Sequence, residues 1–462
     1  MAKLNKYMFR EYDIRGKESE DELNPESISL IAKSYGTFLR KRGIDQAVVG
    51  HDNRETSEDF YKSSIEGLRS TGVSVIGIGK CLTPMMYWSQ YHFKVDGGLM
   101  VTASHNPSGW NGVKLACGLS YTLKDEEIAE ILKVAESENF EKGEGTYREE
   151  DVADKYIDDL LSRAKLHRTL KVVVNTANST SSFFSPKLLK KFGCEVIEHN
   201  TNPDPSYPNY VPNPANVEMM EDTGKQVVKN KADVGIAVDA DGDRLGVTDE
   251  KGETIWPDRW LILLSRLILE KHKGAKIIFD VKVSEALPED IRAHGGVPIM
   301  WKTGHSYIKE KMHEEKASLA GEQSGHVFFV DDFYGFDDAN FAAMKLLEYT
   351  SQQSEPLSKI ISKTPYYVST PAYHAKVDDS VKYKIVDELT DQFKKEGYRV
   401  VDINGARVYL EGGWGLVRAS ANLPALVLRF EAKDQATVEK IEKMFKEKLS
   451  KYPEVAKVWE SA

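Results

Sequence analysis

The stretch Gly97-Gly98-Leu99-Met100-Val101-Thr102-Ala103-Ser104-His105-Asn106-Pro107 joins an apolar run to a polar turn. The run from Gly97 to Val101 is typical of a buried strand, and Asn106-Pro107 forces the chain to turn after it. Open α/β sheets place their chemistry at strand ends of this kind. Ser104 is therefore either a nucleophile or phosphate carrier, or a turn serine with a capping role.

Length and charge limit what the chain can be. Its 462 residues fit roughly three domains of about 150 residues, or four smaller ones. The net charge of -10 argues against a general nucleic-acid binder. An acidic protein that handles anions must gather its Arg and Lys side chains locally, so the cationic loops are the ones to follow.

Cysteine usage and hydropathy predict a cytoplasmic protein. The three cysteines, Cys81, Cys117 and Cys194, are odd in number and lack metal-ligand spacing, which suits a reducing compartment. The first nine residues lack the apolar region of a signal peptide, and no apolar run reaches 18 residues. We therefore expect no membrane partner.

The order of predicted elements indicates a repeated α/β architecture. Strands alternate with helices, which favours right-handed βαβ crossovers and a mostly parallel sheet, and the pattern restarts near Asp125 and Lys251. From Tyr366 onward strands follow one another, as in an antiparallel α+β domain. The segment 9–16 is too polar for a core strand, so we expect a loop that presents Tyr12 and Arg15.

Three aspartates follow the apolar strand Val234–Val238. Asp239, Asp241 and Asp243 stand at i, i+2 and i+4, and carboxylates about 4 Å apart repel by about 4 kcal/mol per pair at an effective dielectric near 20. A divalent cation removes that repulsion, and all-oxygen ligands favour Mg2+ or Ca2+. The alternative is an exposed acidic turn. Arg244 is either the salt-bridge partner of these aspartates or a clamp for a substrate phosphate.

Other polar loops follow predicted strands further along the chain. In Gly321-Glu-Gln-Ser-Gly-His326, Glu322 and Ser324 alternate on one side, as polyol recognition requires, although an ordinary tight turn fits as well. Arg418-Ala-Ser-Ala-Asn422 has the composition of a phosphate cradle, or of a simple hairpin loop. Taken singly, Lys282, Lys302 and His305 are surface cations or satisfied side chains.

Taken together, these loops resemble the signature loops of the α-D-phosphohexomutase family, and most of all its bifunctional phosphomannomutase/phosphoglucomutase branch. The matching segments run from residue 12 to residue 420. They are Tyr12-Asp-Ile-Arg15-Gly, Thr102-Ala-Ser-His-Asn-Pro107, Asn111-Gly-Val-Lys114, Asp239-Ala-Asp-Gly-Asp-Arg244, Lys302-Thr-Gly-His305, Gly321-Glu-Gln-Ser-Gly-His326 and Gly413-Trp-Gly-Leu-Val-Arg-Ala-Ser420.

The resemblance implies three similar mixed α/β domains and a C-terminal α+β domain arranged around a central cleft. The expected domains are a phosphoserine domain (1–148), a metal-binding domain (149–252), a sugar-binding domain (253–365) and a phosphate-binding domain (366–462). It implies reversible interconversion of hexose 1-phosphate and hexose 6-phosphate, of mannose, glucose or both, through phosphorylated Ser104 and a 1,6-bisphosphate. The expected cofactors are Mg2+ and a hexose 1,6-bisphosphate activator, the partners are sugar phosphates, and the protein is a monomer or dimer.

The resemblance also assigns roles to residues. Ser104, Asp239, Asp241 and Asp243 would hold Mg2+. The transfer site would comprise Arg15, Ser104, His105, Lys114, Arg244 and, as general acid or base, His326. Substrate binding would fall to Tyr12, Lys282, Lys302, Thr303, Gly304, His305, Glu322, Ser324, Arg418, Ser420, Ala421 and Asn422.

The chain departs from that branch at two loops. Its phosphate loop reads Ser420-Ala421-Asn422 where the branch usually has Ser-Asn-Thr, and Asn175-Thr-Ala-Asn-Ser179 lacks the family's glycines, so positive φ angles there would be strained. Gln323 is a residue expected in phosphoglucosamine mutases, which leaves that activity as an alternative. A Mg2+-dependent sugar phosphatase and a non-catalytic sugar-phosphate binder are the other two.

Overall fold

The computed structural model describes residues 4–421 and 423–461. The chain folds into two compact units, Met1–Trp256 with Ser324–Lys359 (unit 1) and Pro257–Gln323 with Ile360–Ala462 (unit 2). Asn422, a predicted phosphate ligand, lies outside the described residues.

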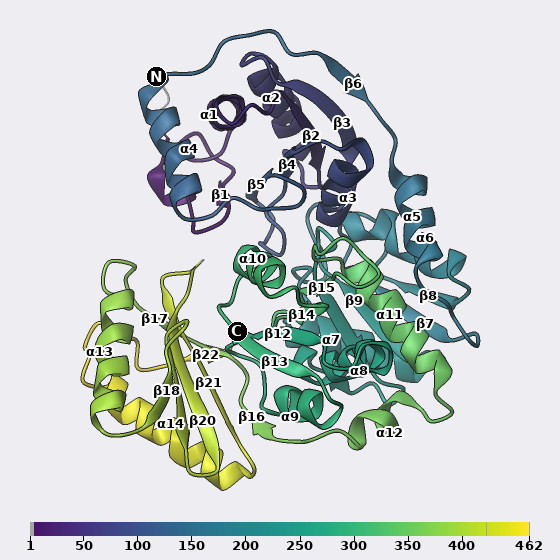
Figure 1. The fold of residues 1–462 in the computed structure, drawn as a ribbon, viewed down its shortest axis with the longest axis vertical. Helices are drawn as coiled ribbons and strands as arrows, with labels where there is room; N and C mark the ends of the chain where they lie inside the picture. The colour runs from purple at the N-terminus through teal and green to yellow at the C-terminus, as the bar shows by residue number, and fades with distance from the viewer. Residues whose placement is uncertain (1–3, 422, 462) are drawn as a thin grey trace. The chain divides into compact units, whose positions relative to one another are not determined.

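Unit 1 begins with a six-stranded sheet in the order β1-β5-β4-β2-β3-β6 (Figure 1). The strands β4, β2, β3 and β6 pair in parallel, whereas β1 and β5 pair antiparallel at one edge. The strands are β1 (Ile14–Lys17), β2 (Gln46–His51), β3 (Ser74–Lys80), β4 (Gly97–Val101), β5 (Trp110–Cys117) and β6 (Tyr147–Glu149). The helices are η1 (Lys6–Met8), α1 (Pro25–Lys41), α2 (Ser57–Arg69), α3 (Thr83–Phe93) and α4 (Glu126–Ser137).

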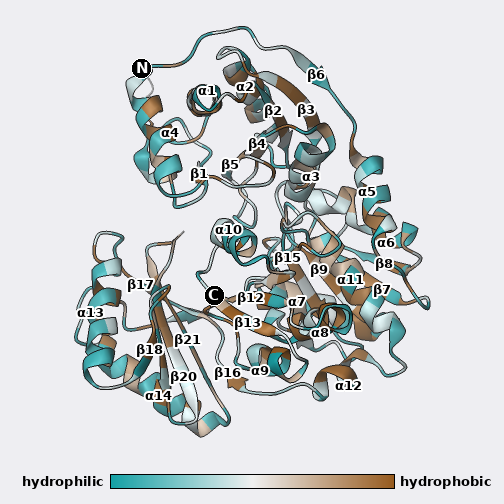
Figure 2. Ribbon diagram, in the orientation of Figure 1, coloured by the Kyte–Doolittle hydropathy of each residue, from teal (hydrophilic) through white to brown (hydrophobic). Residues whose placement is uncertain are grey.

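Helices cover both faces of this sheet, which is why β4 is apolar throughout. A methyl group added at Gly97 would meet Leu39 of α1, whereas one added at Gly98 would meet Met86 of α3. Neighbouring strand residues point to opposite faces, so α1 and α3 lie on opposite sides. Brown strands against teal outer helices in Figure 2 show the same distribution of hydropathy.

A second sheet of unit 1 has the order β11-β10-β9-β7-β8. Its strands are β7 (Lys171–Asn175), β8 (Glu195–His199), β9 (Val234–Val238), β10 (Leu245–Thr248) and β11 (Thr254–Ile255). The helices are α5 (Ala153–Ser162), η2 (Thr180–Phe183), α6 (Ser185–Lys191) and α7 (Val217–Asn230), and the return segment adds β15 (Val327–Phe329) and α11 (Ala339–Gln352). A short helix, α12 (Leu357–Ser362), spans the residues where unit 1 passes into unit 2.

Unit 2 contains a parallel group of strands in which β12 lies between β13 and β14. Its elements are α8 (Pro257–Lys271), β12 (Lys276–Asp280), α9 (Ala286–Ala293), β13 (Val297–Trp301), α10 (His305–Glu315) and β14 (Leu319–Gly321). The C-terminal part is an antiparallel sheet, as the sequence predicts, with the order β18-β19-β20-β21-β17-β22 and with β16 beside β21.

The C-terminal part of unit 2 contains the strands of this sheet and the helices α13 and α14. They are β16 (Val368–Ser369), β17 (Tyr373–Lys376), α13 (Lys382–Lys395), β18 (Arg399–Val401), β19 (Ala406–Leu410), β20 (Gly413–Ala419), β21 (Ala425–Ala432), α14 (Gln435–Leu449) and β22 (Glu460–Ser461). The chain forms two strands here, β16 and β17, because Pro371 lies between them and has no N–H to donate to a sheet.

One local prediction needs correction. The segment 9–16 is not wholly a loop, because Ile14–Lys17 forms β1, and pairing with β5 satisfies a backbone that hydrophobicity alone does not mark as a strand. Further along the chain, η2 is followed directly by α6, with Pro186 in the first turn of α6. In the glycine-free loop 175–179, Ala177 and Asn178 adopt positive φ angles of 47° and 64°.

Candidate active site

Ser104 stands just beyond the C-terminal end of β4, in a strained turn. Its φ angle is 50°, a left-handed conformation that disfavours a residue with a Cβ by about 1–2 kcal/mol. The Ser104 N–H donates to Thr102 Oγ1 at 2.8 Å. The side chain is buried, with Oγ 3.1 Å from His105 Nδ1 and 3.3 Å from Asp239 Oδ2. The turn therefore aims the hydroxyl at the three aspartates.

Arg54 holds this turn, and the sequence analysis missed it. Its guanidinium donates to the carbonyl oxygens of Ser104 and Asn106 at 2.6 Å each, of Pro107 at 2.9 Å and of Trp110 at 3.0 Å. Arg54 is buried and bonded to Asp52 at 3.2 Å. No motif marks this arginine in the sequence, because its partners are backbone atoms.

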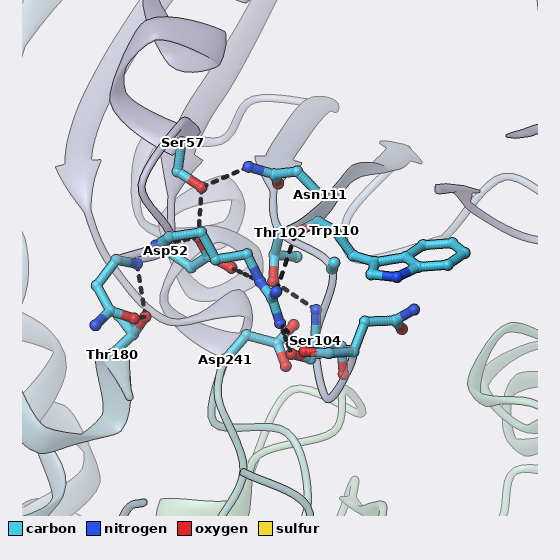
Figure 3. Close-up of polar contacts among 12 residues, drawn as sticks. Asp52, Ser57, Thr102, Ser104, Trp110, Asn111, Thr180 and Asp241 are labelled. Atoms are coloured by element: carbon cyan, nitrogen blue, oxygen red, sulfur yellow. Dashed lines mark hydrogen bonds and ion pairs between the residues drawn. The ribbon is translucent and has the colours of Figure 1, made fainter. Parts of the chain in front are cut away.

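Asp52 is in turn fixed by its neighbours. Its carboxylate accepts from Ser57 Oγ at 2.5 Å, and Asn111 Nδ2 donates to the same serine at 3.0 Å. Figure 3 shows this chain of contacts running from Asn111 through Ser57 to Asp52, beside the turn that carries Ser104. The side chains that support the Ser104 loop are buried and hydrogen-bonded to one another, so they hold the loop in one conformation.

Two cations reach the site from the antiparallel edge of the first sheet. Arg15, on β1, donates to Asn106 Oδ1 at 2.8 Å, to the Ala103 carbonyl at 3.2 Å and to Asp13 at 2.7 Å. Lys114, on β5, donates to Asp241 at 2.7 Å and to Asp243 at 2.5 Å. Tyr12 is buried and interacts electrostatically with Arg15.

The three aspartates lie in the loop between β9 and β10, and each is fully buried. Asp239 Oδ1 shapes the loop by accepting from the N–H groups of Gly242, Asp243 and Arg244 at 3.0–3.1 Å. Asp241 Oδ1 and Asp243 Oδ1 are buried oxygens without a hydrogen-bond donor among the described residues. The ligand atoms of all three carboxylates lie within 4.8 Å of one another, a donor set that fits a hard divalent cation.

Protonation in this cluster follows from burial and charge. Burial, reinforced by the carboxylates of Asp243 and Asp241, raises the pKa of Asp239 well above its ordinary value. Burial also opposes ionisation of Asp241, yet the Lys114 ammonium prevails and lowers the pKa of that carboxyl. Lys114, Arg15 and Arg244 all interact with these carboxylates, yet Asp241 Oδ1 and Asp243 Oδ1 still lack a hydrogen-bond donor among the described residues.

His326 adjoins the aspartates from the segment before β15. Arg244 Nε donates to His326 Nε2 at 3.0 Å, which assigns the ring proton to Nδ1, and Nδ1 lies 2.9 Å from Asp337 Oδ2. Asp337, a residue that the sequence analysis missed, thus faces the protonated nitrogen. Arg244 also interacts electrostatically with Asp239, so its charge lies beside the aspartates as well as beside His326.

His105 completes the unit 1 site. Burial, together with the nearby charges of Arg244 and Arg15, lowers the pKa of His105 well below its ordinary value, so the ring is neutral at pH 7. A neutral imidazole can form a hydrogen bond with Ser104 Oγ without adding a positive charge to the site. Unit 1 therefore brings together the residues predicted for the transfer site and for metal binding: Arg15, Ser104, His105, Lys114, Asp239, Asp241, Asp243, Arg244 and His326.

The predicted sugar loops meet around Asp280 in unit 2, another residue that the sequence analysis passed over. Asp280 accepts from Thr303 Oγ1 at 2.8 Å and from the Gln323 N–H at 3.0 Å, and Lys282 Nζ lies 3.5 Å from it. The Gly304 N–H donates to the buried Glu322 carboxylate at 2.5 Å. The ends of β12, β13 and β14 are thereby joined into one polar cluster.

The remaining predicted substrate-binding residues differ in burial and in position. His305 is buried at the start of α10, whereas Lys302 is half-buried and lies over the Tyr307 ring. Ser324 is the first residue of the return segment, so it belongs to unit 1 rather than to the unit 2 cluster. Arg418 and Ser420 are buried at the end of β20, and Ala421 is half-buried beside them.

Lys382, at the start of α13, fixes the loop that follows β20. Its ammonium donates to the carbonyl oxygens of Ser420 at 2.6 Å and Leu423 at 3.2 Å, and to Asp379 at 2.6 Å. Sequence reasoning had no signal for it, since a lysine on a helix is usually solvated. The loop is therefore held from behind by a buried cation.

Profiles of one protein family match most of the chain. Sequence profiles described as phosphoglucomutase/phosphomannomutase alpha/beta/alpha domains I, II and III match residues 6–142, 154–252 and 256–367. The profile of the C-terminal domain of the same proteins matches residues 374–448. The chain belongs to the phosphoglucomutase/phosphomannomutase family.

Relatives within this family span almost the whole chain. A phosphomannomutase/phosphoglucomutase from Pseudomonas syringae pv. tomato is 37% identical over 444 residues, which cover 96% of this chain and 95% of the relative. A phosphoglucomutase from Neisseria gonorrhoeae is 36% identical over 463 residues, covering 99% and 100%. The crystal structure of a phosphoglucomutase/phosphomannomutase family protein from Burkholderia thailandensis superimposes with a TM-score of 0.91 at 36% identity, over 97% of this chain and 98% of that one.

Family membership confirms the predicted fold class, three α/β domains and a C-terminal domain of a different kind. As a phosphohexomutase, the protein is an enzyme that acts on sugar phosphates. Across the described ranges 4–421 and 423–461, no helix is both long enough and apolar enough to cross a bilayer.

Proposed function

We propose that this enzyme interconverts the 1-phosphates and 6-phosphates of glucose and mannose by passing a phosphoryl group through Ser104. The observation that carries the proposal is the aim of Ser104 Oγ, 3.3 Å from Asp239 in a buried cluster that holds Lys114 and borders Arg15 and Arg244. Phosphoryl transfer depends mainly on positioning and charge neutralisation, and this cluster supplies both.

Asp239, Asp241 and Asp243 would bind Mg2+ together with an oxygen on Ser104. The fit rests on the two buried carboxylate oxygens without donors among the described residues and on the spacing of the three carboxylates. When bound, the ion would neutralise charge on the transferring phosphoryl group. A hexose 1,6-bisphosphate would serve as activator, since it can phosphorylate Ser104. We place the enzyme in the cytoplasm, as a monomer or dimer.

The protein side chains would carry the proton and the remaining charge. In the forward step the P–Oγ bond of phosphoserine 104 breaks and a P–O bond to the sugar hydroxyl forms. The hydroxyl proton passes to His326 Nε2, and the departing Ser104 Oγ takes a proton from the Lys114 ammonium. Asp337 keeps the other ring nitrogen protonated, and Arg244 must then release Nε2 to the substrate. In the return step Ser104 Oγ takes the other phosphoryl group of the 1,6-bisphosphate and gives its proton back to Lys114. His326 returns its proton to the departing sugar oxygen.

Unit 2 supplies groups suited to holding the substrate. Glu322 and Ser324 would bind sugar hydroxyls, with Lys282, Lys302, Thr303, Gly304 and His305 assisting. The phosphate that does not react would be bound by Arg418, Ser420, Ala421 and Asn422. Arg418 is buried, and its Nε lacks a hydrogen-bond acceptor among the described residues, as expected for a guanidinium awaiting an anion.

A coupled assay tests the proposal. It follows conversion of glucose 1-phosphate to glucose 6-phosphate with Mg2+ and catalytic glucose 1,6-bisphosphate, and Ser104→Ala should lower the rate by several orders of magnitude. Intact mass before and after incubation with the bisphosphate should show one added phosphoryl group that maps to Ser104. An undiminished rate in the variant would reject Ser104 as the carrier.

The same assay separates the alternatives. Faster turnover of glucosamine phosphates than of glucose or mannose phosphates would make the enzyme a phosphoglucosamine mutase. Release of inorganic phosphate without isomerisation would indicate a phosphatase instead.

A further inference from the structure

His374 lies on the same sheet face as Arg418, in the C-terminal part of unit 2. In the antiparallel register Arg418 of β20 is opposite Val427 of β21, and Val427 is opposite His374 of β17. Directly opposed residues of antiparallel strands point their side chains to the same face. Their neighbours Ala419, Leu426 and Ala375 point to the other face, where they belong to the apolar core under α13 and α14.

The backbone of Lys282 is bound to this same face. Arg429, two residues beyond Val427 on β21, shares its orientation, and its guanidinium donates to the Lys282 carbonyl and to Asp258. Arg407 of β19, in the row of Arg429, donates to the carbonyls of Val281 and Val283 at 2.7 and 2.8 Å. Two buried arginines therefore fix the Lys282 loop beside the row that carries Arg418 and His374.

The charged groups that face His374 are mostly cations, and of these Lys282 Nζ lies 3.5 Å from the Asp280 carboxylate. His374 faces Lys282 and Arg418, and across the strand pair it faces Glu460, whose carboxylate is already bonded to Lys376 at 2.6 Å. The Arg418 Nε is buried and lacks an acceptor within the described ranges. A phosphate dianion has the charge and the acceptors that this arrangement lacks.

We propose that His374 is a further ligand of the phosphate group that Arg418 binds beside Lys282, and that it takes up a proton when a phosphate dianion binds. The inference rests on the proposed function in that it takes the bound anion to be a sugar phosphate. The proton comes from solvent and stays on the imidazole while the anion is bound. Binding at this site thus selects the dianion.

The electrostatics of the unliganded patch agree. Burial, with the charges of Lys282 and Arg418, lowers the pKa of His374, and Glu460 only partly opposes this. The ring is therefore neutral at pH 7 without ligand. A dianion beside it reverses the sign of the local field and raises the pKa, so protonation and binding favour each other.

Calorimetry on the full-length enzyme tests this coupling. Glucose 6-phosphate is titrated at pH 7.5 with EDTA present to prevent turnover, in two buffers of different ionisation enthalpy, so that the difference in heat counts protons taken up. We expect wild type to take up a fraction of a proton that His374→Gln does not, and the variant to bind roughly 3- to 10-fold more weakly. His313→Gln, an exposed histidine of α10 in the same unit, is the matched control and should behave as wild type.

A second variant separates charge from shape. His374→Lys carries a permanent charge, so it should bind close to wild type at pH 8.5 without the proton uptake. Equal proton uptake in wild type and His374→Gln, or weak binding by His374→Lys with a native unfolding profile, would overturn the inference. If the enzyme shows no mutase activity but still takes up a proton on binding, the proposed function is rejected and the inference about His374 stands.

Discussion

Replacing Arg54 by lysine should uncouple the Ser104 loop from its support while keeping the positive charge beside Asp52. The guanidinium donates to four carbonyl oxygens of the loop and to the Asp52 carboxylate. An ammonium has three donors, and if one stays with Asp52, at most two carbonyls can be served. At least two of the four therefore lose their donor.

The size of the effect follows from that count. A hydrogen bond to a charged group contributes about 1.5–3 kcal/mol, so two lost bonds predict a destabilisation of about 3–6 kcal/mol if the loop stays in place. If the loop relaxes instead, a displacement of about 1 Å at the reacting atom lowers the transfer rate about 100-fold. Either outcome is large, and the two are distinguishable.

The assay is the rate at which glucose 1,6-bisphosphate phosphorylates Ser104, followed by intact mass, alongside unfolding in urea. Arg42→Lys is the control, since Arg42 is partly exposed and pairs with Glu130 at the surface. A variant Arg54→Lys that matches wild type in both stability and phosphorylation rate would refute the view that Arg54 holds the loop.

Three further predictions concern the same unit. Mg2+ at ten times its Kd should stabilise the enzyme by about 1.4 kcal/mol, and Asp241→Asn should remove that gain, as read by thermal unfolding with and without EDTA. Burial raises the pKa of Asp338 to about 7, so ionisation of this residue destabilises the fold progressively between pH 4 and pH 7. Asp338→Asn should therefore be more stable than wild type at pH 8, by on the order of 4 kcal/mol, and as stable as wild type near pH 4. Equal stability of the two proteins at both pH values would contradict this. Gly325→Ala should lower the free energy of unfolding by about 1–3 kcal/mol and impair turnover. The φ angle at Gly325 is +98°, and the added Cβ would lie 2.8 Å from the Leu245 carbonyl oxygen, next to His326. Unchanged unfolding in urea would argue against this.

The sequence by itself determined the chemistry that each loop can offer. An apolar strand followed by a polar turn indicated Ser104 and Asp239–Arg244 as candidate site residues. Hydrophobic periodicity and turn residues depend on only a few neighbouring positions, so they can be recognised in the sequence. The spacing of the aspartates predicted a charge cluster in need of a cation, and the structure shows them buried together with two carboxylate oxygens that lack donors. The domain boundaries and the roles of individual residues stay predictions.

Tertiary structure alone decided which groups support those loops. Arg54 acts on carbonyl oxygens up to 56 residues away, and Asp337 and Asp280 contact His326 and Thr303 in other loops. Backbone acceptors are the same in every residue, so a side chain that binds them leaves no pattern in the sequence. The strand Ile14–Lys17 is a similar case, because its hydrogen bonds to β5, and not its own hydropathy, make it a strand.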